Sequence, residues 1–265
     1  MTRPDLATLL ADLRAEGELL EELLRPLPLA DWDAPTPSDG WAIRHQVAHL
    51  AWTDQAVLSA TEDPGSFAAL RERFARDPDV VDRAAQEGAA RPSAEILESW
   101  CHSRSRVLEA LAAVPDGGRI PWIGTPLGAA MMASARIMET WAHGQDVRDA
   151  LGLPSSDSPR LRHIAHLAVA ARDYAFQQRH LPPPAEPFRV ALTSGSGDVW
   201  TWGPPDAAQR VRGSGLDFAL LATRRRHRQD CAVTAEGPDA DAWLDIVQAY
   251  AGPPGLGREP RSEAG

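Results

Sequence analysis

The hydrophobic spacing of the chain changes at Leu181–Pro184, a Leu-Pro-Pro-Pro segment, and this change restricts the possible folds more than any other feature. Before it, apolar residues recur every three or four positions, which is the spacing of one face of a helix. After it, short runs rich in β-branched and aromatic residues alternate with glycine-containing turns, as in strands. The stiff proline linker between the two patterns indicates a helical part followed by a smaller part of mixed structure.

Seven helices are expected before the proline segment. They cover Asp5–Leu24, Trp41–Ala60, Ser66–Asp77, Val80–Glu87, Ser93–Val114, Pro126–Leu151 and Arg160–Arg179. Ser93 is predicted to cap the N-terminus of the fifth helix, and Thr125 that of the sixth, with Pro126 in the first helical position. The predicted first domain is therefore a helical bundle over residues 1–181.

Strands and helices mix after the proline segment. Strands are expected over Phe188–Thr193, Asp198–Trp202, Gln209–Arg212 and Cys231–Ala235, and helices over Ser214–Arg225 and Asp239–Ala251. This mixture predicts a small α+β domain over residues 185–252, so the chain as a whole belongs to the α+β class. Residues 253–265 are rich in Gly and Pro and are predicted to form a flexible tail.

The chain has 265 residues and contains no Lys and no Asn, so all 27 of its basic residues are Arg. Without Lys it cannot form a Schiff base with a substrate or with pyridoxal phosphate. It also lacks the Lys that P-loop proteins and protein kinases place on phosphates. Without Asn there is no N-glycosylation sequon. The formal net charge of −10 argues against a nucleic-acid partner, which would need a basic surface.

The two cysteines, Cys101 and Cys231, lie far apart and form neither a disulfide framework nor a CxxC metal pair. This usage suits a reducing cytoplasm, and a catalytic thiolate is not expected at either Cys. The first ten residues carry no basic-then-apolar targeting pattern, and no apolar run approaches about 18 residues. We therefore expect a cytoplasmic protein with no membrane partner that acts on a small molecule as a monomer or homodimer.

Glu139 and His143 are four residues apart in an otherwise apolar helical segment, so their side chains leave the same face about one turn apart. Such a pair can present two ligands to one metal ion. His49 lies in another apolar stretch and could supply a third ligand, although a single core His is more often hydrogen-bonded to a backbone carbonyl. His45 and His49 could instead form their own i, i+4 pair. Two His and one carboxylate would leave a position open for water or substrate, as a catalytic Zn²⁺ requires.

Two sequence blocks resemble the DinB-like superfamily. They are Asp39–Leu50, which reads Asp-Gly-Trp-x3-His-Gln-Val-Ala-His-Leu, and Glu139–Gly152, which reads Glu-x3-His-Gly-Gln-Asp-Val-Arg-Asp-Ala-Leu-Gly. More narrowly, they are similar to the actinobacterial branch that contains mycothiol-dependent maleylpyruvate isomerase. The resemblance implies an N-terminal four-helix metal-binding bundle and a small C-terminal α+β domain. It also implies that His49, Glu139 and His143 bind Zn²⁺ or another divalent metal, and that mycothiol is the thiol co-substrate.

A third block, Phe218–Arg225, resembles the family segment whose Arg reaches towards the active site from the second domain. The match assigns a catalytic role to Arg225, although the family has a Gly just before this Arg and the present chain has Arg224 there. An Arg fork can hold a substrate carboxylate. Alternatively, these cations stabilise the dipole at a helix C-terminus.

The resemblance implies metal-dependent addition, isomerisation or transfer of a low-molecular-weight thiol on a small acidic or conjugated substrate. Two alternatives fit the same residues. One is a thiol-independent hydrolase, lyase or cyclase in which the metal activates water or acts as a Lewis acid. The other is a non-catalytic binding protein whose metal is structural, which would require a closed set of four protein ligands.

Overall fold

The computed structural model describes residues 5–77, 79–255 and 257–261. Within it, the contacts between residues group into two compact units, Met1–Pro154 and Ser155–Gly265. Each unit is described by itself below. Within the described ranges, every helix is too short or too polar to cross a lipid bilayer.

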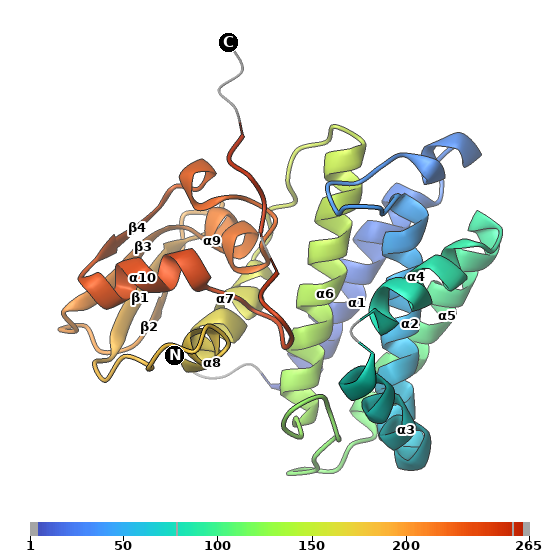
Figure 1. Ribbon diagram of the computed structural model, residues 1–265, viewed down its shortest axis with the longest axis horizontal. Helices are drawn as coiled ribbons and strands as arrows, with labels where there is room; N and C mark the ends of the chain where they lie inside the picture. Colours follow the sequence, from blue (N-terminus) through green and yellow to red (C-terminus); the bar gives the residue numbers. More distant parts are fainter. Residues whose placement is uncertain (1–4, 78, 256, 262–265) are drawn as a thin grey trace. The chain divides into compact units, whose positions relative to one another are not determined.

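Four long helices form the first unit: α1 (Leu6–Leu24), α2 (Ile43–Glu62), α5 (Ser93–Ala112) and α6 (Ala129–Ala150). Helices α1 and α2 each pack against both α5 and α6, which makes a four-helix bundle (Figure 1). Two shorter helices, α3 (Pro64–Arg76) and α4 (Val80–Ala89), connect α2 to α5 and pack on α2. The predicted four-helix bundle is thereby confirmed.

Two apolar clusters fill the bundle core. The first includes Leu9, Leu13, Val57, Val107, Leu111 and Met132, and the second includes Leu20, Leu24, Ile43, Leu50, Trp100 and Val147. Along α2 and α5, the stretch between the two clusters carries the buried polar side chains Asp54 and Ser103. The apolar face of each long helix therefore drives packing, while a polar layer separates the two clusters.

An ion pair lies at the centre of this polar layer. Nη2 of Arg136 on α6 is 2.9 Å from Oδ1 of Asp54 on α2, and both side chains are less than 5% exposed. The Ser103 hydroxyl donates to Oδ2 of Asp54 at 3.3 Å. Burial raises the pKa of Asp54, and the Arg136 guanidinium and the Ser103 hydroxyl oppose part of that rise. The pair ties α2 to α6 inside the bundle.

Two predicted helix starts are wrong. Helix α6 begins at Ala129 with Gly128 as its N-cap, rather than at Pro126 with Thr125 as its cap. The preceding segment is instead held as an isolated bridge, because Ile120 and Leu127 exchange two backbone hydrogen bonds of 2.7 and 2.9 Å. In α5, Ser93 is the first helical residue and Pro92 occupies the N-cap position.

The second unit contains a four-stranded mixed sheet in the order β2-β1-β3-β4. Strand β1 (Phe188–Thr193) pairs antiparallel with β2 (Val199–Trp202) and parallel with β3 (Gln209–Ser214), and β3 pairs antiparallel with β4 (Val233–Glu236). Its helices are α7 (Leu161–Ala170), α8 (Arg172–Gln177), α9 (Gly215–Ala222) and α10 (Pro238–Ile246) (Figure 1). The α+β class is confirmed.

The helix predicted over Arg160–Arg179 is interrupted at Ala171 and belongs to the second unit. Helix α7 packs on α9, and α8 packs on α10, so both join the sheet unit rather than the bundle. The compact units therefore divide after Pro154, ahead of the boundary expected at residues 181–185. That residues 1–181 and 185–252 each form a domain that folds independently stays a prediction.

Part of the expected tail over residues 253–265 makes hydrogen bonds. The Tyr250 hydroxyl donates to the Pro254 carbonyl at 3.0 Å, and the Arg261 backbone N–H donates to the Asp230 carboxylate at 3.0 Å. Residue 256 and residues 262–265 lie outside the described ranges. Flexibility of this segment stays a prediction.

We expect Gly203→Ala to destabilise the second unit. Gly203 follows β2 with a φ of +75°, and an added Cβ would lie 1.9 Å from the Phe188 carbonyl oxygen. The positive φ alone costs an L-residue roughly 1–2 kcal/mol, and the clash with backbone adds to that. Urea unfolding of the variant should show a loss larger than this range. Gly197→Ala is the matched control, because Gly197 has a φ of +90° and open space around its Cβ position. Equal losses in the two variants would contradict the steric account.

Candidate metal centre

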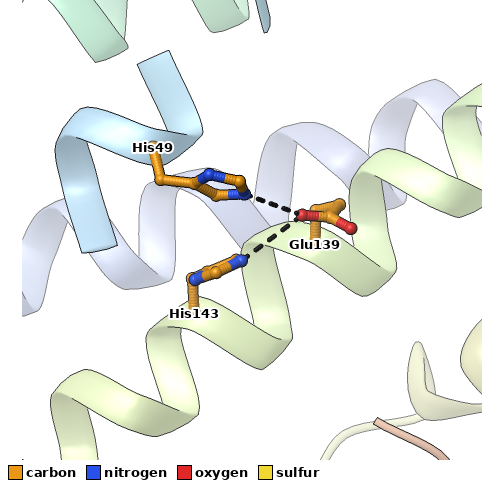
Figure 2. A group of neighbouring side chains, drawn as sticks. All are labelled: His49, Glu139 and His143. Atoms are coloured by element: carbon orange, nitrogen blue, oxygen red, sulfur yellow. Dashed lines mark hydrogen bonds and ion pairs between the residues drawn. The ribbon is translucent and has the colours of Figure 1, made fainter. Parts of the chain in front are cut away.

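Three side chains from two helices of the bundle converge on one point (Figure 2). His49 comes from α2, and Glu139 and His143 come from α6. Oε2 of Glu139 is 3.4 Å from Nε2 of His49 and 3.4 Å from Nε2 of His143. One ligand atom from each residue lies within 4.8 Å of the other two. The structure thus brings together the three predicted site residues of the first unit.

Local helix geometry explains this convergence. Glu139 and His143 are one turn apart on the same face of α6, and α2 packs beside that helix. The side chains of His49, His143 and Glu139 are 9%, 12% and 23% exposed, so the group is set into the bundle but remains reachable from outside. Both α6 residues lie C-terminal to Arg136, whose pairing with Asp54 ties α6 to α2.

The carboxylate of Glu139 is held in its ionised form. Burial alone would raise its pKa, but hydrogen bonds from His143 and His49, together with their charges, hold the pKa well below the ordinary value. An ionised carboxylate and two imidazole nitrogens form a donor set that suits Zn²⁺ and several other divalent metals. The residues present therefore fit a divalent metal ion.

Gln46 orients one of the two imidazoles, and we did not predict this from the sequence. Its Oε1 lies 2.5 Å from Nδ1 of His143, and its Nε2 donates to the Thr36 hydroxyl at 2.9 Å. Because Gln46 offers an oxygen acceptor, it favours a proton on Nδ1 of His143, which would leave Nε2 to serve as the ligand atom when a metal ion replaces its hydrogen bond to Glu139. The signal available in sequence is the spacing of Gln46 three residues before His49, which places both on one face of α2.

The other imidazole has a different environment. Nδ1 of His49 is buried and, within the described ranges, has no hydrogen-bond partner. The ring of Trp41 packs on both imidazoles, with ring centroids 5.4 Å from His49 and 6.1 Å from His143. On the Nδ1 side, the His49 ring is therefore held by packing against Trp41 rather than by a hydrogen bond.

His45 does not join the group. Its Nδ1 accepts a hydrogen bond from the Ala42 backbone N–H at 3.0 Å, which caps the first turn of α2. Its Nε2 contacts the side-chain oxygen of Gln86 on α4 at 3.0 Å. Both ring nitrogens are engaged in holding helix α2, so a ligand pair of His45 with His49 is not formed.

Arg225 lies in the second unit, just after α9. Its Nη1 donates to the Thr223 carbonyl at 2.8 Å, which agrees with the helix-terminus alternative for that donor. Its catalytic role stays a prediction. The residue before it, Arg224, has a φ of +61°, a conformation that favours Gly, which is the residue the family pattern has at this position.

The cysteines do not supply a reactive thiolate. Burial raises the pKa of the Cys101 thiol to about 11 and that of the Cys231 thiol to about 12. Both thiols are therefore protonated near neutral pH. Among the described residues, the candidate metal group contains no Cys.

A four-helix bundle that carries a candidate metal centre of two His and one Glu, followed by a small mixed-sheet unit, defines a DinB-like fold. The model of the mycothiol maleylpyruvate isomerase N-terminal domain matches residues 13–148, half of the chain, and the chain belongs to this family. A second model, described as wyosine base formation, matches residues 184–236 of the sheet unit.

Individual relatives and solved structures also match the chain. Uncharacterized proteins from two Mycobacterium tuberculosis strains, CDC 1551 / Oshkosh and H37Rv, are each 54% identical over 249 residues, covering 94% of this chain and 97% of their own. The crystal structure of the mycothiol-dependent maleylpyruvate isomerase has a TM-score of 0.61 at 17% identity, covering 90% of this chain and 98% of its own. A histidine-to-alanine mutant of that isomerase gives 0.63 at 18% identity with the same coverage. At such identities the likeness shows the fold.

We expect Gln46→Leu to weaken metal binding by about 10- to 100-fold, because His143 would lose the acceptor that fixes its ring. Competition between the protein and a chromophoric chelator for Zn²⁺ measures this affinity. Gln46→Glu should bind nearly as well as the parent, since a carboxylate also accepts from Nδ1 of His143. Gln86→Leu is the control, because Gln86 contacts His45 outside the metal centre. A Gln46→Leu protein with the affinity of the parent would contradict this role.

Proposed function

We propose that this protein is a metal-dependent enzyme that uses a low-molecular-weight thiol for addition, isomerisation or transfer on a small acidic or conjugated substrate. The observation that carries the proposal is the group of His49, Glu139 and His143, a two-His, one-carboxylate set that leaves coordination positions open for a ligand from outside. Mycothiol is the proposed thiol, because the matched family model and crystal structures are named for its use.

The metal ion would be held by Nε2 of His49, Nε2 of His143 and the Glu139 carboxylate. When bound, it would lower the pKa of a coordinated thiol, so that the thiolate is available near neutral pH. Gln46 would hold a proton on Nδ1 of His143, and the Trp41 ring packs on both imidazoles. The protonated state of Cys101 and Cys231 keeps the chain's own thiols out of the reaction.

Arg225 is proposed to hold the carboxylate of the acidic substrate or of the thiol cofactor through its guanidinium fork. We further propose that the protein acts in the cytoplasm as a monomer or homodimer, on small molecules rather than on nucleic acid or membranes.

The deciding experiment combines metal analysis with thermal unfolding. The purified protein should contain about one divalent metal per chain, and mycothiol should raise its unfolding temperature in the metal-loaded form. The control is mycothiol alkylated on sulfur, which should give no shift because it has no thiol to coordinate. If the enzymatic activity of this protein persists in a host unable to make mycothiol, the hydrolase, lyase or cyclase alternative is favoured. A metal held by four protein ligands would favour the structural one.

A further inference from the structure

Aromatic rings continue outward from the metal centre along one side. The Trp41 ring is stacked near His143, with an interplanar angle of 23°. The ring of Trp52 lies 6.2 Å from His49 between centroids, and Phe74 on α3 follows at 5.6 Å from Trp52. Trp41, Trp52 and Phe74, here called the aromatic wall, thus run from the two imidazoles onto α3.

The three rings of the aromatic wall are only partly buried. The large core aromatics Trp100, Trp141 and Phe67 of the same bundle are, by contrast, at most 2% exposed. The accessible ring surface beside a polar centre is apolar area that a bound group could cover with a gain in free energy. Because the rings adjoin the candidate metal centre, a molecule that reacts there would be the group placed to cover them.

The polar contacts of the wall indicate the charge of this group. Nε1 of Trp41 donates to the Asp82 carboxylate on α4 at 3.0 Å, and the neighbouring His45 contacts the neutral Gln86 amide. A substrate carboxylate placed beside Trp41 would lie near the Asp82 carboxylate and be repelled by it. A flat, uncharged group would instead stack on the rings, an arrangement worth about 2- to 12-fold in affinity per ring.

We propose that the aromatic wall binds an aryl or extended conjugated group of the substrate, which lies beside the metal-bound sulfur of the thiol. The inference rests on the proposed function and names the substrate class of the same site: a molecule whose reacting end is flat and uncharged. A substrate carboxylate, where present, is then on the part of the molecule remote from the wall.

The test uses the Co²⁺-loaded full-length protein and two thiol probes, benzyl mercaptan and ethanethiol. Thiolate-to-cobalt absorption in the near ultraviolet reports binding of each probe. The ratio of the two affinities is compared between the parent protein and the Trp52→Ala and Phe74→Ala variants, so that the different acidities of the thiols cancel. Leu70→Ala is the matched control, because Leu70 is on the same helix as Phe74 but packs against the apolar core.

We expect each wall variant to lower the preference for benzyl mercaptan by about 2- to 12-fold while keeping full cobalt uptake, and Leu70→Ala to leave the preference unchanged. If both thiols bind with the same preference in the parent and in both wall variants, the proposed role of the aromatic wall is refuted. The proposed thiol chemistry is then unaffected. Failure of both thiols to alter the cobalt spectrum overturns the thiol chemistry, and the wall proposal with it. Because Phe74 lies on α3, outside the four-helix bundle, its variant also keeps the test valid should Trp52→Ala fold poorly.

Discussion

Replacing Glu139 with Ala should abolish stoichiometric metal binding. Glu139 is the residue that faces both imidazoles, at 3.4 Å from each Nε2 atom, and its ionised carboxylate balances the positive charge of a divalent ion. Removing it leaves two neutral nitrogens, so we expect affinity for Zn²⁺ to fall by more than the roughly 100-fold upper range seen for residues that only orient a ligand. Metal content after dialysis, measured by plasma emission spectrometry, checks the result.

His49→Ala should give the same loss, because it removes the one ligand that α2 provides. His45→Ala is the control next to the centre. It should retain one metal per chain and lose only the stability of a helix cap, about 0.5–2 kcal/mol. Retained metal in both Glu139→Ala and His49→Ala would show that the ion binds elsewhere.

Replacing Arg136 with Met should destabilise the first unit by about 3–5 kcal/mol, because the buried Asp54 would lose its counter-charge. The loss should depend on pH. Without Arg136, the folded-state pKa of Asp54 lies further above its unfolded value. Folding then favours the protonated acid, so stability is higher at low pH and falls as pH rises. Chemical unfolding at pH 5 and pH 7.5 should therefore show the larger loss at pH 7.5.

The double variant Asp54→Leu, Arg136→Met completes the test. Replacing both charges with apolar side chains of similar size should restore stability to near the parent value, since no charge is left buried. Arg76→Met serves as the surface control, because the Arg76–Glu72 pair is 79% and 67% exposed and should contribute at most about 1 kcal/mol. A double variant as unstable as the single one would show that packing, rather than charge, sets the loss.

The sequence predicted most of the fold because helix periodicity is local. The spacing of Leu residues in α1 and the turn between Glu139 and His143 depend on neighbours within a few positions. The start of α6 was missed because the competing bridge joins Ile120 to Leu127 across a loop, a pairing that no helical pattern reveals. Likewise, periodicity predicts a helix after Arg160, but it does not predict which of the two units that helix packs on.

The candidate site could be predicted in part for a similar reason. His49, Glu139 and His143 stand out as polar residues in apolar stretches, and family resemblance joined the two segments. The choice between His45 and His49 depended on the direction of each side chain, which spacing leaves open. The role of Gln46 depended on its reach across to α6, a contact between residues 97 positions apart.

His49 and Glu139 are 90 positions apart in the chain, with three helices between them. An ion bound to both closes a long loop, so it acts as a removable cross-link whose strength follows the supply of free metal in the cell. Occupancy at about 1,000 times the dissociation constant would add about 4 kcal/mol to the folded state. Removal of such an ion would release this link between α2 and α6, so a metal-free chain would open more often than a metal-loaded one.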